Sequence, residues 1–550
     1  MKKIILLLPF LLASLSIATA ANGIYNVRDY GAKGDGKHID SPAINAAIKA
    51  ASTAGGGTVY LPAGTYLSYS IRLKSHTALY LEQGSVLKAT IPNDSLHYDL
   101  PEENPNNQYQ DFGHSHWKNS LIWGIGLEDV SIRGFGLIDG TEGITRGQRR
   151  MNGHPSANKA IALKECRNVT IRDISMLRCG HFAMLLTGVD NLTIDNVRCD
   201  TNRDAFDIDC CANVRVSNCQ VNTPNDDGIV LKCSYALGYA KPTEQVTITN
   251  CHVSGYDVGT LLDATYQKTQ KAAPDRDGPT GRIKLGTESN GGFKNITISN
   301  CTFDHCRGLA LETVDGAPIE DVTISNIAMR DICNSPIYIR LGNRARGPKE
   351  LPVSTIRRVK LSNIVVKDAD CRYASMIFGI EGHPIEDVTL SGIHIQYRGG
   401  ITLDDVRYQR GTNPFFTRMN ERVNDTTERR IRIEHADADE TARDLYDVPQ
   451  MEKGYPEPSS HGILPAYGLF VSHARNVTID DIRLETLRED ERPPVVLMDV
   501  EEVTLRHIKT DKAAAAPYVV AKEVKDLQIV DFHGIKDVKK EKVTDLEIKK

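Results

Sequence analysis

Val169-Thr170-Ile171, Leu192-Thr193-Ile194 and Val214-Arg215-Val216 repeat one short pattern, in which a polar residue stands between two apolar ones. The three copies begin at positions 169, 192 and 214, which are 23 and 22 residues apart. Alternation of this kind, rich in β-branched residues, is typical of a strand with one buried face. A strand that returns at a nearly constant spacing predicts a solenoid in which each repeat forms one coil.

The pattern continues toward the C-terminus at longer and uneven intervals, which indicate loops inserted between coils. The further copies are Val246-Thr247-Ile248, Ile296-Thr297-Ile298, Val322-Thr323-Ile324, Val359-Lys360-Leu361, Val388-Thr389-Leu390, Val477-Thr478-Ile479 and Val503-Thr504-Leu505. The longest expected insertions span residues 233–245, 257–290 and 405–460. Because the spacing leaves no room for helices between strands, we expect an all-β, right-handed parallel β-helix. A leucine-rich horseshoe, the alternative solenoid, would need a leucine spacing that the chain lacks.

An Asn follows most of the repeated strands. These residues are Asn196, Asn218, Asn250, Asn300, Asn326 and Asn363. Asn tolerates left-handed backbone geometry in turns, so we expect these side chains to stack as a hydrogen-bonded ladder.

The ends of the chain differ from the repeats. Lys2 and Lys3, an apolar run over residues 4–17 and Ala18-Thr19-Ala20 predict a signal peptide at residues 1–20, and therefore export to the periplasm or outside the cell. Residues 22–55 are expected to cap a single β-helix domain over 22–540, with a short N-terminal helix that starts at Ser41 as N-cap and has Pro42 in its first turn.

Composition limits the partners of the protein. The formal net charge is −5 and no basic arm is present, so nucleic acid is not an expected partner. No segment after the leader is apolar enough to predict a membrane partner, and we expect a monomer. All 12 cysteines lie between Cys166 and Cys371 without zinc-type spacing, which favours buried thiols over disulfides and predicts neither metal nor cofactor.

Two acidic clusters are the strongest functional signal. Asn202-Arg203-Asp204 and Asn225-Asp226-Asp227-Gly228 lie about one repeat apart, so stacking would place them side by side. Carboxylates gathered in this way on a long surface are the usual means of cleaving a glycosidic bond.

Four further segments support a family resemblance. They are Asn26 to Gly36, Gly56 to Tyr66, Trp117-Lys118-Asn119-Ser120-Leu121-Ile122 and Gly134 to Gly140. Together with the acidic clusters they resemble glycoside hydrolase family 28, the pectin-degrading polygalacturonases. The resemblance implies inverting hydrolysis of α-galacturonosidic linkages in pectin, with Asp226 as general acid and with Asp204 and Asp227 activating the water. The insertions favour exo-action on galacturonan or rhamnogalacturonan oligosaccharides.

The chain departs from the family at its basic residues. The family motif Asn-Thr-Asp becomes Asn202-Arg203-Asp204, and Ala310-Leu311-Glu312 stands where the family has Arg-Ile-Lys. Six residues are expected to serve the substrate instead. They are Arg282, Lys284, Glu288, Lys232, Asn202 and Arg340. Glu288 has two open roles, support of the acid–base chemistry or a bond to Arg282.

Two other functions remain open on this fold. A pectate lyase would hold calcium with the Asp residues and use Arg or Lys as base, whereas a glycan-binding or adhesive β-helix would use none of them catalytically.

Overall fold

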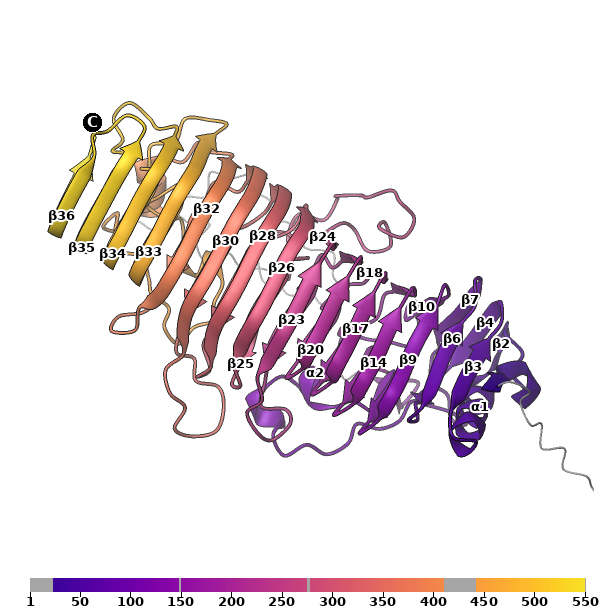
Figure 1. Cartoon of the computed structure of the whole chain (residues 1–550). Coiled ribbons are helices and arrows are strands. Elements are labelled where there is room, and N and C mark those ends of the chain that lie inside the picture. The colour runs from indigo at the N-terminus through magenta and orange to yellow at the C-terminus, as the bar shows by residue number, and fades with distance from the viewer. Residues whose placement is uncertain (1–22, 148–149, 275–276, 410–441, 550) are drawn as a thin grey trace, which may run out of the picture.

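The computed structural model describes residues 23–147, 150–274, 277–409 and 442–549. The expected signal peptide at residues 1–20 and residues 410–441 of the expected insertion lie outside this part of the chain. Parallel strands wind into one long solenoid from β1 to β35, and the antiparallel strand β36 ends it (Figure 1). The predicted all-β parallel β-helix is therefore confirmed. Within these ranges, no helix has the length and apolar character needed to cross a bilayer.

Each coil contributes one strand to each of three runs of hydrogen-bonded strands, here called the first, second and third sheets. The first sheet contains β1 (Ile24–Asn26), β3 (Gly57–Leu61), β6 (Thr77–Leu81), β9 (Glu128–Gly134), β14 (Arg167–Arg172), β17 (Asp190–Asp195), β20 (Ala212–Ser217) and β23 (Thr243–Thr249). The second contains β2 (Asp35–Ile39), β4 (Gly64–Ser68), β7 (Ser85–Ala89), β10 (Leu137–Asp139), β15 (Ser175–Leu177), β18 (Arg198–Asp200), β21 (Gln220–Asn222) and β24 (His252–Ser254). The third contains β5 (Ile71–Arg72), β8 (Ser120–Ile125), β13 (Lys159–Lys164), β16 (Phe182–Thr187), β19 (Phe206–Asp209), β22 (Ile229–Cys233), β25 (Ile283–Ser289), β27 (Leu309–Thr313), β29 (Ile337–Leu341) and β31 (Ser375–Phe378).

Later coils have longer strands that serve more than one sheet. Strands β26 (Phe293–Asp304), β28 (Pro318–Ile332), β30 (Thr355–Ala369) and β32 (Ile385–Tyr397) continue the first and second sheets. Strands β33 (Leu469–Thr486), β34 (Val495–Thr510) and β35 (Val519–Phe532) also include the third sheet, and β36 (Val538–Ile548) pairs with β35. A small hairpin, β11 (Arg150–Met151) and β12 (His154–Pro155), lies outside the coils.

In the described parts of the chain, helices are few and short. They are α1 (Ser41–Thr53), α2 (Phe112–Ser115), α3 (Leu403–Tyr408), η2 (Val27–Tyr30), η3 (Asn107–Tyr109) and η4 (Pro458–His461). Helix α1 covers the N-terminal end with its buried Ile44, Ala47 and Ile48, as the sequence predicts. The predicted N-cap is wrong, because Asp40 occupies that position, and its carboxylate accepts hydrogen bonds from the backbone of Lys33 and Gly34.

The repeated sequence pattern is also the structural register. Val169 pairs with Leu192, and Leu192 with Val214, along the first sheet, and the same column continues to Val503. The Asn residues that follow take positive φ angles, for example 58° at Asn326. Asn326 donates to Asn300 at 3.0 Å and accepts from Asn363 at 3.2 Å, so the expected ladder exists along this edge.

The cysteines also follow the stack. All twelve lie in described residues, are buried and form no disulfide, as expected. Cys219, Cys251 and Cys301 occupy successive coils next to paired residues of the second sheet, where their side chains fill the interior.

The third sheet has a charged outer face in the middle and apolar outer faces on both sides. Inward residues such as Ile208, Leu231 and Leu285 join the core, whereas Asp207 and Lys232 alternate with them and point outward. We call the covered apolar surfaces on either side the N-terminal patch and the C-terminal patch. The N-terminal patch is Trp117, Ala162, Phe182, Leu185 and Ala236, and the C-terminal patch is Ala310, Tyr338, Ala374, Met376, Phe378, Leu464, Ala466, Phe470, Val496 and Val520.

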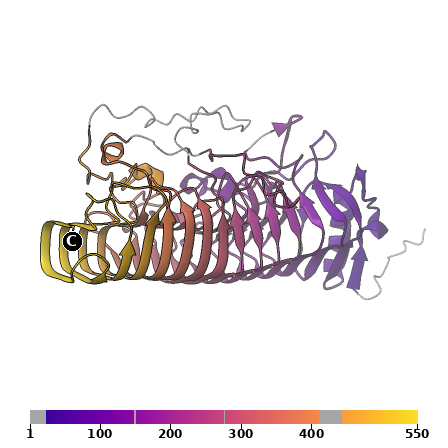
Figure 2. The ribbon, with the colours of Figure 1, turned by 90° about the horizontal axis from the view of Figure 1, so that it is seen from above.

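The segments that cover these patches come from the insertions. Figure 2 shows that the non-strand segments gather along one side of the solenoid. Residues near α2 contribute Trp117 to the N-terminal patch, and residues after η4 contribute Leu464 and Ala466 to the C-terminal patch. The charged stretch between the patches is where the acidic clusters lie.

The Asn ladder gives a test of the coil geometry. Replacing Asn326 by Ala should lower the melting temperature more than replacing it by Gly, because Ala in the left-handed region costs about 1–2 kcal/mol and Gly does not. Thermal unfolding followed by circular dichroism measures the difference. An Ala variant as stable as the Gly variant would contradict the proposed origin of the Asn preference.

Candidate active site

Stacking brings Asp204, Asp226 and Asp227 together, as expected from the repeat. Asp204 precedes β19 and Asp227 precedes β22, and the pairing of these strands places the two residues side by side. The backbone N–H of Asp227 donates to Asp204 at 3.0 Å and to Asp226 at 3.1 Å. Carboxylate oxygens of all three residues lie within 4.8 Å of one another.

The carboxyls of Asp204 and Asp226 have opposite protonation tendencies. Burial and the adjacent Asp226 carboxylate raise the pKa of Asp204 well above its usual range. Burial would also raise the pKa of Asp226, but the guanidinium of Arg203, the hydrogen bond with Asp204 and the charge of Lys232 together hold that pKa well below its usual range. Nε of Arg203 donates to Asp226 Oδ2 at 2.8 Å. Within this pair Asp204 therefore favours the protonated state and Asp226 the ionised state.

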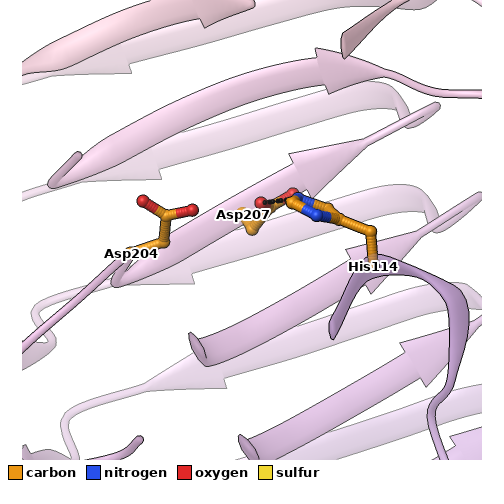
Figure 3. Close-up of side chains that lie close together, drawn as sticks. All are labelled: His114, Asp204 and Asp207. Carbon is orange, nitrogen blue, oxygen red and sulfur yellow. Dashed lines mark hydrogen bonds and ion pairs between the residues drawn. The ribbon is translucent and has the colours of Figure 1, made fainter. Parts of the chain in front are cut away.

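A second cluster stands behind Asp204 on β19 and β22. Asp207 Oδ2 lies 2.8 Å from His114 Nε2 and 3.1 Å from Lys232 Nζ. Figure 3 shows His114 directed at Asp207, with the Asp204 carboxylate on the other side of Asp207. Burial and Lys232 would lower the pKa of His114, but Asp111 and Asp207 raise it well above its usual range. Lys232 Nζ is also 3.5 Å from Asp204, so it links the two clusters.

Asp227 is held by two buried cations on the next coil. Arg282 Nε donates to it at 2.8 Å, and Lys284 Nζ lies 3.3 Å away. Both side chains also face Glu312, at 3.7 and 3.3 Å.

The other end of Arg282 binds a residue of the long insertion. Its Nη2 donates to Glu457 at 2.7 Å, and Glu457 also accepts from Arg307. Arg282 and Lys284 are only 2% and 1% exposed. In the structure carboxylates of the chain bind both residues, and their expected contact with a substrate carboxylate stays a prediction. Through these ion pairs Arg282 and Lys284 orient Asp227.

The remaining expected residues have different outcomes. Glu288 binds Lys232 at 3.3 Å and Arg346, so of its two open roles a bond to Arg282 is not seen. Arg340 is 1% exposed and donates to the backbone carbonyls of Phe378, Gly379 and Gln450. It thereby fastens the insertion to β31, and its expected role in substrate binding stays a prediction.

Asn202 lies at the edge of the site. Its side-chain oxygen accepts a hydrogen bond from Asn225, whose own oxygen accepts from Gln270 at 2.5 Å. This short ladder aligns the two acidic clusters laterally.

Among the residues that the structure describes, two groups offer oxygens or nitrogens close enough for a metal ion. They are His114, Asp204 and Asp207, and Asp204, Asp226 and Asp227. Lys232 and Arg203 already bind oxygens of these groups, and a nearby cation opposes the binding of another. We assign no metal to either group.

Comparison with known proteins agrees with this architecture. A family model described as rhamnogalacturonase A/epimerase, pectate lyase-like, matches residues 24–96, and a model of the right-handed β-helix region matches residues 118–270. The chain is a right-handed parallel β-helix.

Relatives of this β-helix include enzymes and a binding protein. It is 24% identical over 390 residues to a "Probable polygalacturonase" of Vitis vinifera, covering 67% of this chain and 73% of that protein. It is 37% identical over 180 residues to "Plasmin and fibronectin-binding protein A" of Streptococcus pneumoniae (strain ATCC BAA-255 / R6), covering 32% of this chain and 23% of that protein.

A solved structure supports the fold. The hyperthermoactive exopolygalacturonase from Thermotoga maritima matches with a TM-score of 0.54 and 20% identity, over 68% of this β-helix and 88% of that chain. The resemblance to polygalacturonases that the sequence motifs indicated is thus confirmed as a likeness in sequence and fold.

The insertion that carries Glu457 gives a prediction about pH. His461 donates from Nδ1 to the carbonyl of Pro449 at 2.8 Å and accepts from the Tyr338 hydroxyl at 2.9 Å. Burial, with Arg340 nearby, lowers its pKa to about 3. His in an unfolded chain titrates near pH 6.5. Between about pH 6.5 and pH 3, His461 therefore binds a proton when its segment is unfolded but not when the segment is folded. The segment should lose about 1.4 kcal/mol of stability per pH unit until about pH 3.

Hydrogen exchange of residues 446–464 at pH 7 and pH 4.5 measures this effect. After each rate is divided by the intrinsic amide exchange rate at that pH, the wild type should be less protected at pH 4.5 than at pH 7, and a His461→Gln variant should show a smaller loss of protection. Equal pH dependence in the two proteins would contradict the role of His461.

Proposed function

We propose that the protein is a pectin-degrading glycoside hydrolase that cleaves α-galacturonosidic linkages. The observation that carries the proposal is the carboxylate trio, in which Asp204 favours the protonated state and Asp226 the ionised state. A general acid and a general base with opposite states are what glycoside hydrolysis requires. The relatedness to polygalacturonases supports pectin as the substrate class.

The mechanism uses one proton donor and one activated water. One carboxyl of the Asp204–Asp226 pair protonates the leaving oxygen, and Asp227, fixed by Arg282 and Lys284, holds the water for attack. Inversion follows the family resemblance. The separation of the oxygens, within 4.8 Å, is shorter than the roughly 6.5–9.5 Å common in inverting enzymes, so spacing alone does not supply it.

The two covered patches support exo-action. The charged stretch of the third sheet is bordered along the solenoid axis by the N-terminal patch and the C-terminal patch, each overlaid by insertion segments. A long polysaccharide lying along the axis would meet one of these segments, whereas a chain end or short oligosaccharide would fit between them. Galacturonan or rhamnogalacturonan oligosaccharides are therefore the proposed substrates.

Specific observations bear on the two alternatives, a calcium-dependent lyase and an adhesive β-helix. Calcium-dependent lyase chemistry is disfavoured because Arg203, Lys232 and Arg282 bind the carboxylates that calcium would need. Adhesion is favoured by the 37% identity to a plasmin- and fibronectin-binding protein, although that match covers 32% of this chain. The leader pattern supports export, to the periplasm or outside, as the place of action.

Replacing Asp226 by Asn tests the hydrolase. Release of reducing ends from galacturonan oligosaccharides should fall by at least about 100-fold, the usual contribution of general acid–base catalysis, while the circular dichroism spectrum is kept. Lys522→Gln, on an exposed ion pair of the last coils, is the matched control and should keep activity.

Product analysis separates the alternatives. A hydrolase gives saturated products and keeps its activity with a chelator present. Unsaturated products that absorb in the ultraviolet and vanish with the chelator would indicate a lyase. Full turnover by the Asn variant would remove Asp226 from the mechanism.

A further inference from the structure

Arg203 and Asp226 form the most accessible ion pair of the carboxylate trio. The Arg203 side chain is 16% exposed, compared with 8% for Lys232, 2% for Arg282 and 1% for Lys284. The Asp226 side chain is 23% exposed, compared with 4% for Asp204 and 5% for Asp227. An arriving ligand therefore meets this pair before the others.

Arg203 also differs from the other cations in how it is bound. Lys232, Arg282 and Lys284 each pair with carboxylates on two different coils, Lys232 with Asp204 and Glu288 and the other two with Asp227 and Glu312. The ion pair of Arg203 is with Asp226, and both Nε and Nη2 approach the same oxygen, Oδ2. A guanidinium fork binds a carboxylate best through two parallel bonds to two oxygens, so this fork is not used to its full capacity.

We propose that Arg203 recognises the free carboxylate of a galacturonic acid residue by exchanging its bond to Asp226 for a bond to the substrate. This inference rests on the proposed function and names the group of the substrate that the site selects. A methyl-esterified residue has no charge to offer and would leave the Arg203–Asp226 pair intact. The selected substrate is therefore unesterified at the cleavage position.

The exchange also assigns the acid and the base. Asp226 is faced by Asp204 and Asp227, by Lys232 on β22 and by Arg203, while Asp111 and His181 stand behind Arg203. Once Arg203 binds the substrate, its positive charge no longer offsets the repulsion among the carboxyls of the trio. The proton on Asp204 then passes to Asp226, which becomes the acid, and Asp204 remains ionised 3.5 Å from Lys232 as a base. No proton enters or leaves the site in this step.

Calorimetric binding of D-galacturonate, a product that cannot be cleaved further, tests the exchange. Arg203→Thr should weaken binding about 10- to 100-fold, the range of a charge-assisted contact. Arg203→Lys, which keeps charge but loses the fork, should fall between that variant and the wild type. D-galactose, which lacks the carboxylate, should show no such dependence on residue 203.

A double-mutant cycle separates exchange from simple charge. Asp226→Asn removes the competitor for Arg203 and should tighten galacturonate binding about 5-fold or more, and this gain should disappear when Arg203 is also Thr. Lys522→Gln, at the ion pair with Asp545 on the last coils, is the control and should change affinity by less than about 3-fold. Arg346→Gln, at the partly buried pair with Glu288, should also have little effect.

The possible negative results distinguish the exchange at Arg203 from the proposed hydrolase activity. The exchange would be overturned if Arg203→Thr kept wild-type affinity or if Asp226→Asn bound more weakly. It would also be overturned if Arg346→Gln lost affinity or if the wild type did not bind galacturonate. If such a result came with normal release of reducing ends, the hydrolase would stand and the exchange alone would fall. If the affinities follow the prediction but no pectic substrate is cleaved, the carboxylate recognition stands and the hydrolase falls.

Discussion

The register of stacked coils is the constraint on which the rest of the structure depends. Once Val169, Leu192 and Val214 are aligned in one column, every residue one coil apart becomes a lateral neighbour. On the third sheet this alignment forces Asp204 and Asp227 together, although repulsion between carboxylates opposes it. The fold can hold them there because many backbone hydrogen bonds and a continuous apolar core stabilise the register.

The repulsion among the gathered carboxylates is offset by cations that lie around them. Arg203, Lys232 and Arg282 surround the trio, and a second layer of carboxylates, including Asp207 and Glu457, lies behind these cations. Buried charges that are paired and hydrogen-bonded on several sides are tolerated, and they form fixed electrostatic surroundings for a reaction. The same arrangement explains why Arg282 and Lys284, chosen from the sequence as substrate ligands, are bound by carboxylates of the chain in the structure. It leaves Arg203 as the most exposed of these cations.

The sequence was informative wherever the repeat extends. The strands, the Asn ladder, the buried cysteines and the neighbourhood of Asp204 with Asp227 all follow from positions within a coil. Residues delivered by insertions had no such signal. Glu457 reaches Arg282 across 175 positions of sequence, and His114 reaches Asp207 across 93. Such contacts depend on how loops fold over the third sheet, which periodicity does not describe. Arg340 shows the same limit, because its cluster of basic neighbours suggested a ligand while its partners in the structure are backbone carbonyls.

The central claim is that a pectic chain end lies between the two covered patches, over the carboxylate trio. A crystal structure of the Asp226→Asn variant with digalacturonate tests it most directly. The account predicts the linkage between the two sugars above Asp204 and Asp227, with one carboxylate on the guanidinium of Arg203. Digalacturonate bound on another sheet, or lying across a patch with no contact to the trio, would contradict the account.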